Sequence, residues 1–433
     1  MTTVLSFLLP AVALAGLHAQ EPLTIQDAIR KAWSGQSGLQ AGEAMVERAQ
    51  AEAEALKNLR LPTFSAAAGI TRTDEPMMAF GTRLDQARIS AADFAPSSLN
   101  HPSPITGGSA FLSVTQPLYA GGRLDAARRA GAALATAETS TQAHRRQQVA
   151  LAIEQAYFGS QVAEQGLRWA MDTLRQAQET ERFVTARAEQ GLMLKAEGER
   201  AKAFRASAEA GVAEGRQRLA SARSALALLM GFEPPATLAT PVATEEAAPP
   251  TAPGTRGDLE ALRAQGDAAR QGVIAARGSF LPEVGVSLVA GTDRYSLSSG
   301  GNWTTATVGA RWNFSFADGP RVHAARAMVR ASEEGLKWHQ QQASREVEEA
   351  RRGIEAAQAK IAFAKVALEA SESVRTTRTA RHREGLLPLV EVLDAESALS
   401  GARTLLLNSQ LEWRMSRAQL ALALGQPIEG VKE

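Results

Sequence analysis

Two different spacings of hydrophobic positions alternate along this chain, and the shorter one is two residues. Between Thr305 and Phe316, apolar side chains take every second position and mostly polar ones lie between them. The same alternation occurs over residues 284–290 and 109–115, and more weakly over 63–73. A period of two places apolar and polar side chains on opposite faces of a β-strand. Strands of about ten residues with one apolar face are typical of a membrane β-barrel wall, although a half-buried soluble sheet shows the same pattern.

The longer spacing is seven residues, and it runs through long stretches without proline. A seven-residue repeat predicts helices that wind around each other in a left-handed supercoil. We predict long helices over about 122–190 and 320–384, each followed by an antiparallel return helix, and shorter helices over about 24–58 and 258–278. Large and small side chains alternate along the seams of the second copy: Val347, Ile354, Ile361 and Leu368 with Ala350, Ala357, Ala364 and Ser371, then Val392, Leu399, Leu406, Trp413 and Leu420 with Ala395, Ala402, Ser409, Ser416 and Ala423.

The whole plan occurs twice. Gly191-Leu192 is answered by Gly385-Leu386, an offset of 194 residues that holds from the long helices to the end of both copies. We therefore predict a first repeat over 20–232, a linker rich in Pro, Ala and Thr over 233–257, and a second repeat over 258–433. Each repeat has a helix, two strands and a long helical hairpin. The strand pair of the first repeat is joined by a long polar loop, about Asp74 to Gly108.

Four strands per chain cannot close a barrel, and an open sheet edge is not tolerated in lipid. The chain must therefore assemble with copies of itself. Bacterial barrels begin at about eight strands, so the strand count alone permits a dimer or a larger oligomer.

The N-terminus and the composition limit the classes of protein. Residues 1–19 read as a secretory signal peptide, with an apolar stretch from Val4 to Leu17, and a buried N-terminal helix is the alternative. No later segment has the length and hydrophobicity of a membrane-spanning helix. The net charge of +1 does not favour nucleic-acid binding. The absence of cysteine excludes disulfides and thiol chemistry.

Nothing in the sequence predicts an enzyme, a cofactor or a metal site. There is no phosphate-binding loop, no dinucleotide fingerprint and no nucleophile elbow. The six histidines show no metal-ligand spacing: His18, His101, His144, His323, His339 and His382.

Two motifs now give the chain a family resemblance. Residues 116–123, Gln-Pro-Leu-Tyr-Ala-Gly-Gly-Arg, and residues 389–395, Leu-Val-Glu-Val-Leu-Asp-Ala, resemble the strand-to-helix junction and the return-helix opening of the TolC family. These are outer-membrane channels of bacterial efflux pumps and type I secretion systems. The resemblance implies an α+β membrane protein, a homotrimer whose twelve-stranded β-barrel continues as a coiled-coil α-barrel in the periplasm.

The resemblance also implies function and partners. It implies a passive export duct in the outer membrane that docks to a periplasmic adaptor and, through it, to an inner-membrane transporter. The exported substrate and the class of transporter stay open, because the pump selects them. The alternative is a secreted or periplasmic coiled-coil structural or adhesion protein without a pore.

Three sets of candidate site residues follow. By resemblance, Gly191, Leu192, Gly385 and Leu386 contact the adaptor; leucines that are tucked into the hairpin ends are the alternative. The resemblance also places the periplasmic gate near the tip of the second hairpin. There we predict a closed state that is latched by Arg–Glu pairs between neighbouring helices and does not favour cations. Arginines that point outward to solvent or to the adaptor are the alternative. The gate candidates are Arg375, Arg378, Arg381 and Glu372, with Glu369 and Glu384 as further counter-charges, and the strand-to-helix junctions are Gly121, Gly122, Asp318 and Gly319.

The chain also departs from the family pattern in three places. Its first external loop is long, Pro320 stands where the first junction has Arg123, and the tip of the second hairpin is arginine-rich rather than acidic.

Overall fold

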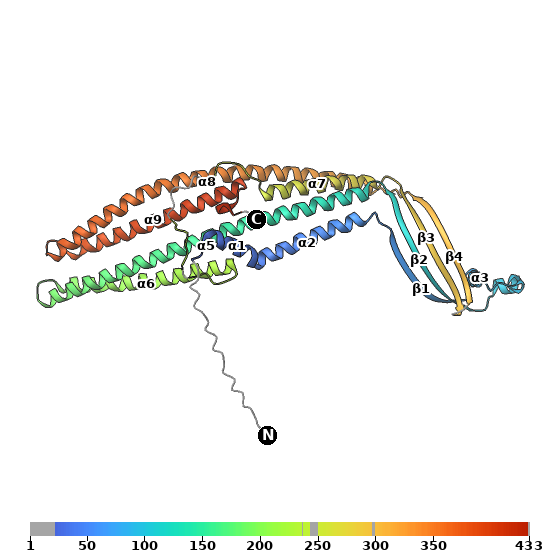
Figure 1. The fold of residues 1–433 in the computed structure, drawn as a ribbon, viewed down its shortest axis with the longest axis horizontal. Helices are drawn as coiled ribbons and strands as arrows, with labels where there is room; N and C mark the ends of the chain where they lie inside the picture. Colours follow the sequence, from blue (N-terminus) through green and yellow to red (C-terminus); the bar gives the residue numbers. More distant parts are fainter. Residues whose placement is uncertain (1–21, 236, 243–249, 297–298, 432–433) are drawn as a thin grey trace, which may run out of the picture. The chain divides into compact units, whose positions relative to one another are not determined.

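The computed structural model describes residues 22–235, 237–242, 250–296 and 299–431 (Figure 1). The predicted signal peptide, 1–19, lies outside these residues. The chain divides into two compact units: Met1–Ala41, His144–Arg256 and Gln342–Glu433 form the first, and Gly42–Ala143 and Gly257–Gln341 form the second. Each unit contains segments of both sequence repeats. The long helices α5 (Arg123–Glu189) and α8 (Asp318–Arg383) each have residues in both units.

The second unit contains an antiparallel sheet in the order β1-β2-β3-β4. The strands are β1 (Thr63–Thr73), β2 (Ile105–Ala120), β3 (Glu283–Ser296) and β4 (Ser299–Arg311). Each predicted strand is present, and β1 has the predicted bounds. The fourth strand is shifted relative to its alternating pattern: it begins at Ser299, before the pattern does, and the chain leaves the sheet after Arg311. In the described part of the chain, β1 and β4 form the two edges of the sheet.

The helices at the start of each repeat lead into this sheet. They are α2 (Ser37–Asn58), which precedes β1, and α7 (Gly257–Gly278), which precedes β3. The sequence predicted one helix over about 24–58, and the structure breaks it at Gln36, which separates α1 (Ile25–Gly35) from α2.

The long loop between β1 and β2 is folded rather than extended. It contains α3 (Pro76–Asp85), a 3-10 helix η1 (Ala91–Phe94) and α4 (Pro96–Asn100). The sequence predicted only a long polar loop here and none of these helices. Residues that favour the start of a helix explain these three elements. Proline occupies the first turn of α3 and of α4, and Ser90 and Asp93 form a capping box at η1.

The first unit is built from coiled-coil hairpins. They consist of α5 with α6 (Lys195–Met230), and α8 with α9 (Leu389–Leu424). The predicted seam of the second hairpin is confirmed, because Ala350, Ile354, Ala357 and Ile361 form one buried cluster with side chains of α9, chiefly Trp413 and Leu420. The predicted bounds of the long helices agree with α5 and α8 to within two residues.

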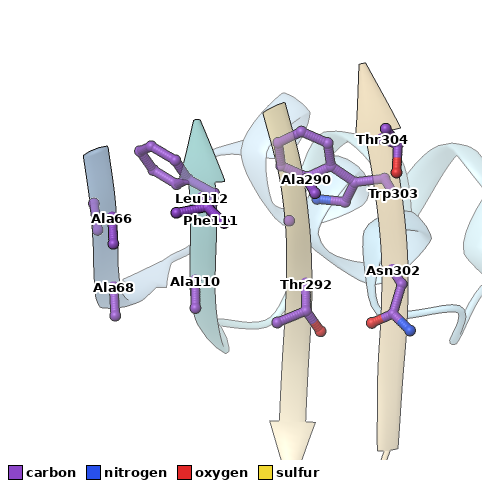
Figure 2. A pocket seen from close by; sticks show the side chains of 12 residues that line it. Ala66, Ala68, Ala110, Phe111, Leu112, Ala290, Thr292, Asn302, Trp303 and Thr304 are labelled. Atoms are coloured by element: carbon purple, nitrogen blue, oxygen red, sulfur yellow. The ribbon is translucent and has the colours of Figure 1, made fainter. Parts of the chain in front are cut away.

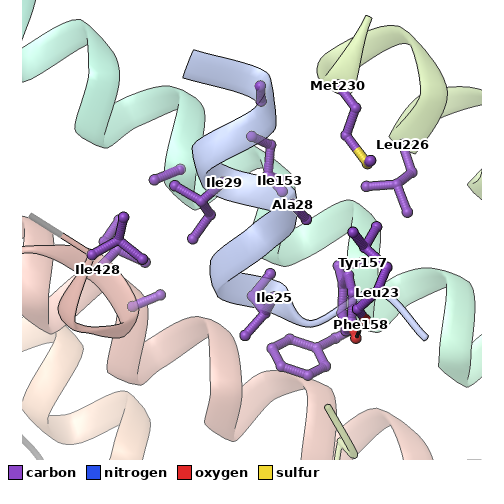
Figure 3. Packing of buried hydrophobic residues seen from close by; sticks show 14 of the residues in the cluster. Leu23, Ile25, Ala28, Ile29, Ile153, Tyr157, Phe158, Leu226, Met230 and Ile428 are labelled. Carbon is purple, nitrogen blue, oxygen red and sulfur yellow. Dashed lines mark hydrogen bonds between the residues drawn. The ribbon is translucent and has the colours of Figure 1, made fainter. Parts of the chain in front are cut away.

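The largest core of the first unit gathers around α1 (Figure 3). Ile25 and Ile29 of α1 pack with Ile153 and Phe158 of α5 and with side chains of α6 and of the C-terminal 3-10 helix η2 (Ile428–Gly430). Tyr157 donates its hydroxyl to the Leu23 carbonyl at 2.6 Å and accepts the Thr240 amide at 2.9 Å. Residues 237–242 of the predicted linker are therefore held against this core.

Candidate functional site

The sheet has one polar face and one apolar face, and this follows from its register. Phe64, Val114, Leu288 and Ala306 pair across the four strands, and the next row along is Ser65, Ser113, Val289 and Thr305. Ser65 and Ser113 share a hydroxyl hydrogen bond of 2.6 Å on the polar face. A membrane barrel turns its apolar face to lipid and its polar face to the lumen. The two faces of this sheet have the chemistry of a channel wall.

Two aromatic side chains interrupt the polar face. Phe111, Gly291 and Trp303 share one row, and the Trp303 ring lies over Gly291, where a Cβ atom would collide with it (Figure 2). Trp303 also donates its indole N–H to Asp293 at 2.7 Å. The hollow at this level is shallow and open, and alanine side chains of β1 and β2 supply much of its lining.

The two strand-to-helix junctions use different chemistry at equivalent positions. Gly121 and Gly122 both have positive φ, +60° and +77°, and a Cβ atom on Gly121 would collide with the Gly278 backbone. In the second junction Asp318 is buried and accepts the Ser315 amide at 3.1 Å, whereas a Cβ on Gly319 would meet nothing within 4 Å. The first junction depends on glycine, and the second depends on a carboxylate.

The two hairpin tips share one backbone motif. Leu192 donates its amide to the Arg187 carbonyl and Gly191 to the Ala188 carbonyl, and Leu386 and Gly385 repeat both bonds one repeat later. This pair of bonds, closed by a glycine with positive φ, is the Schellman motif that ends helices. Leu192 is 68% exposed and Leu386 is 69% exposed, so neither leucine is tucked into its own hairpin.

The arginines near the tip of the second hairpin pair with α9. Arg378 contacts Glu391 at 2.9 Å, and Arg375 lies 3.9 Å from the buried Glu396. Burial raises the pKa of the Glu396 carboxyl, and the charges of Arg375 and Arg403 oppose that shift. Arg–Glu pairs between neighbouring helices are therefore present: those of Arg375 and Arg378 lie within the second hairpin, and Arg383 lies 3.8 Å from Glu179 of the first hairpin.

The partners differ from the three counter-charges that the sequence suggested. Those were Glu369, Glu372 and Glu384. Of these, Glu372 faces Arg403 of α9 at 3.7 Å. Arg381 is exposed on α8. The structure thus brings together Glu372, Arg375, Arg403 and Glu396 as one network across α8 and α9.

Sequence reasoning missed a buried charged cluster in the first unit. Glu154 of α5 is 1% exposed and Arg414 of α9 is 3% exposed. Arg414 donates to the carbonyls of Val242 and Pro241 at 3.0 and 2.9 Å, and it lies 3.5 Å from Glu429. Burial, followed by the charge of Glu429, raises the pKa of Glu154 well above its ordinary value, and Arg414 opposes this shift. No motif marks these residues, because the cluster joins three separate segments.

A second buried polar residue, His382, lies at the second tip. Its Nδ1–H donates to the Leu387 carbonyl at 2.8 Å, and its ring packs edge-on against Phe183 of the first hairpin. Val184, Ala201, Leu389 and Val392 form a buried cluster that also joins the two hairpins. His382 therefore serves the packing of the tips.

Two features are absent from the described residues. Within them, no helix is both long enough and apolar enough to cross a membrane. In the same residues, no group of three or more His, Asp or Glu side chains is arranged to hold a metal ion.

The chain has a sheet with one apolar face and one polar face, and it has long coiled-coil hairpins; each repeat contributes two strands and one hairpin. This combination defines the class of outer-membrane channels. The chain belongs to the outer membrane efflux protein family, whose pattern matches residues 28–232 and 249–426. It is therefore an outer-membrane export channel that extends into the periplasm, and not an enzyme. This excludes the alternative of a coiled-coil protein without a pore. A comparison with curated proteins found no match.

Solved structures show the same fold. The outer-membrane protein VceC from Vibrio cholerae is 22% identical with a TM-score of 0.80, over 93% of this chain and 96% of that one. The CmeC outer-membrane channel of Campylobacter jejuni is 16% identical with a TM-score of 0.82, over 94% and 87%. The open-state MtrE outer-membrane channel of Neisseria gonorrhoeae is 20% identical with a TM-score of 0.77, over 94% and 89%. The predicted fold class is confirmed.

Proposed function

We propose that this chain forms the passive, homotrimeric outer-membrane duct of a tripartite efflux pump and docks to a periplasmic adaptor through its hairpin tips. The observation that carries the proposal is the sheet itself, an open four-stranded segment of wall with a polar face, an apolar face and two edges, β1 and β4. Unpaired backbone at such edges costs several kcal/mol per group in lipid, so copies of the chain have to complete the barrel.

Three copies are the number we propose. Three chains with four strands each supply twelve, an even number within the range of bacterial barrels. The fold shared with VceC, CmeC and MtrE supports this choice, because the strand count alone also permits other multiples.

The hairpin tips support docking to an adaptor. Two equivalent loops each present an exposed leucine on a rigid helix-ending motif, and rigid apolar knobs suit a groove on a partner protein. The driving force for export then comes from an inner-membrane transporter that contacts the same adaptor. Efflux of small molecules is preferred over protein secretion, because the family that the chain matches is named for efflux.

Two measurements test this function. Native mass spectrometry of the purified protein in detergent should give a trimer, and a stable monomer would contradict the assembly. A strain that lacks this chain should accumulate a fluorescent pump substrate such as ethidium, and the full chain supplied in trans should restore export. Normal ethidium export together with a lost extracellular protein would instead indicate type I secretion.

A further inference from the structure

The loop between β1 and β2 folds over the polar face of the sheet. A Cβ atom on Gly107 would lie 2.8 Å from the Gln86 side chain and 2.9 Å from Thr82, and one on Gly301 would collide with the Asp85 carbonyl. A Cβ atom on Gly107 or Gly301 would point to the same side of the sheet as the side chains of Ser109 and Asp293, which is the polar side. Since the polar face lines the lumen, α3 lies inside the mouth of the barrel rather than outside it.

Several contacts hold the loop in this place. Gln86 is buried and donates to the carbonyls of Thr106 and Arg294 at 3.2 and 3.4 Å. The Arg88 guanidinium lies 4.4 Å from the centre of the Tyr295 ring. Arg83 forms an ion pair with Asp93, which also accepts the Ser90 amide. The loop is therefore a fixed element that carries its own small fold.

The two faces of α3 differ in what covers them. Ala79, Thr82 and Gln86 share the face that packs on the strands, and Ala79 is fully buried. Met77, Phe80 and Leu84 share the opposite face, and Phe94 of η1 extends it, with its ring 5.7 Å from that of Phe80. We name Met77, Phe80, Leu84 and Phe94 the loop apolar face. Met77 is 80% exposed, Leu84 54% and Phe94 60%, so one chain leaves this face largely uncovered.

We propose that the loop apolar face of each chain is covered by the same face of the other copies, so that three loops form an apolar lid over the outer mouth of the channel. The proposal rests on the trimer proposed above. It follows from position, because a face that points away from the wall inside a barrel points toward the axis. The copies that complete the barrel at β1 and β4 bring their own loops to the same level. Contact between three such faces removes apolar surface from water, which favours the contact.

Cross-linking tests the contact between copies, and the chain has no cysteine of its own to interfere. The Met77→Cys variant, purified as the full chain in detergent and treated with a short bismaleimide, should give a covalent dimer on denaturing gels. The matched control is Thr82→Cys, which places the thiol on the wall side of the same helix and should not cross-link. Absence of a dimer with Met77→Cys in a preparation that native mass spectrometry shows to be trimeric would overturn the lid alone. Absence of the trimer itself would overturn the proposed assembly instead.

Access to the lumen tests the barrier. Thr73 and Ile105 are directly paired, so a two-residue Asn-Gly turn can replace residues 74–104 without disturbing the strands. Ser113→Cys places a thiol on the lumenal face. In intact cells, a membrane-impermeant polyethylene glycol maleimide should label this thiol severalfold faster in the shortened chain than in the chain with the full loop. Equal rates of labelling in the two chains would contradict an outer lid.

Discussion

Leu192 and Leu386 occupy the same position in two hairpin tips, each donating its amide to the carbonyl of an arginine five residues earlier, Arg187 or Arg381. Both leucines follow a glycine with positive φ, +69° at Gly191 and +79° at Gly385. A left-handed glycine lets the helix end without strain, and the next side chain then projects from a fixed backbone. The duplication thus presents two nearly identical apolar knobs on each chain.

Replacing both knobs should impair export without unfolding the protein. The Leu192→Ser/Leu386→Ser double variant removes apolar surface that its own hairpins do not use, so the trimer should form normally on native gels. Export should fall, as shown by higher ethidium accumulation and lower copurification of the adaptor. The matched control is Leu228→Ser, a leucine that is 80% exposed and lies at the other end of α6. Wild-type export in the double variant would contradict docking through these leucines.

The first strand-to-helix junction should be far more sensitive at Gly121 than at Gly122. Both residues have positive φ, which costs a non-glycine residue roughly 1–2 kcal/mol. A Cβ on Gly121 would in addition collide with the Gly278 backbone, whereas one on Gly122 meets nothing within 4 Å. Gly121→Ala should therefore reduce the heat-modifiable, outer-membrane form severely, and Gly122→Ala only slightly. Equal losses for the two variants would show that φ alone matters there.

Periodicity predicted most of the fold, because strand alternation and heptad seams are local signals that extended elements preserve. It failed where contacts between distant segments decide the outcome. The register of Gly107 and Gly301 against α3 could not be read from spacing, and the loop was predicted only as long and polar. The partners of Arg375 and Arg378 lie on α9, and the nearest acidic residues in the sequence are not those closest in space. Exposure of Leu192 and Leu386 depends on the packing of both hairpins.

The ion pair of Arg378 with Glu391 should help to hold the second hairpin tip closed. The pair is about one-third exposed, so its contribution is about 0.2–1 kcal/mol, or up to roughly fivefold in an open-to-closed ratio. Arg378→Glu should raise the open probability of single channels in planar bilayers. The swap Arg378→Glu/Glu391→Arg should restore it, and Arg381→Ala, on the exposed side of the same helix, should change it little. An unchanged open probability in Arg378→Glu would contradict the latch.

The ion selectivity of the same channels gives a separate test of the arginines at the entrance. Arg375 and Arg378 each face a glutamate of α9, so this level of the entrance should not favour cations. Reversal potentials under a salt gradient measure this directly. Strong cation selectivity that persists unchanged in Arg375→Ser/Arg378→Ser would contradict a role for these arginines at the entrance.

The buried cluster around Glu154 should make stability depend on pH. The groups that face Glu154 are Arg414 and Arg417 of α9 and Glu429 of η2, and burial together with Glu429 raises the pKa of Glu154 in the folded chain. Below the ordinary carboxyl pKa of 4.5, the folded and unfolded chains both hold the proton, so the folded state keeps its full stability. As the pH rises, the unfolded chain releases this proton more readily than the folded chain, so stability is lost up to the raised pKa.

Glu154→Gln removes the buried charge and keeps the shape of the side chain. Its melting midpoint should exceed that of the unmodified chain above neutral pH, by about 1 °C for each 1 kcal/mol gained in a chain of this length, and the difference should shrink toward pH 4. Calorimetry of the purified protein across this pH range makes the comparison. A Glu154→Gln variant that melts below the unmodified chain at pH 8 would show that attraction to Arg414 outweighs burial.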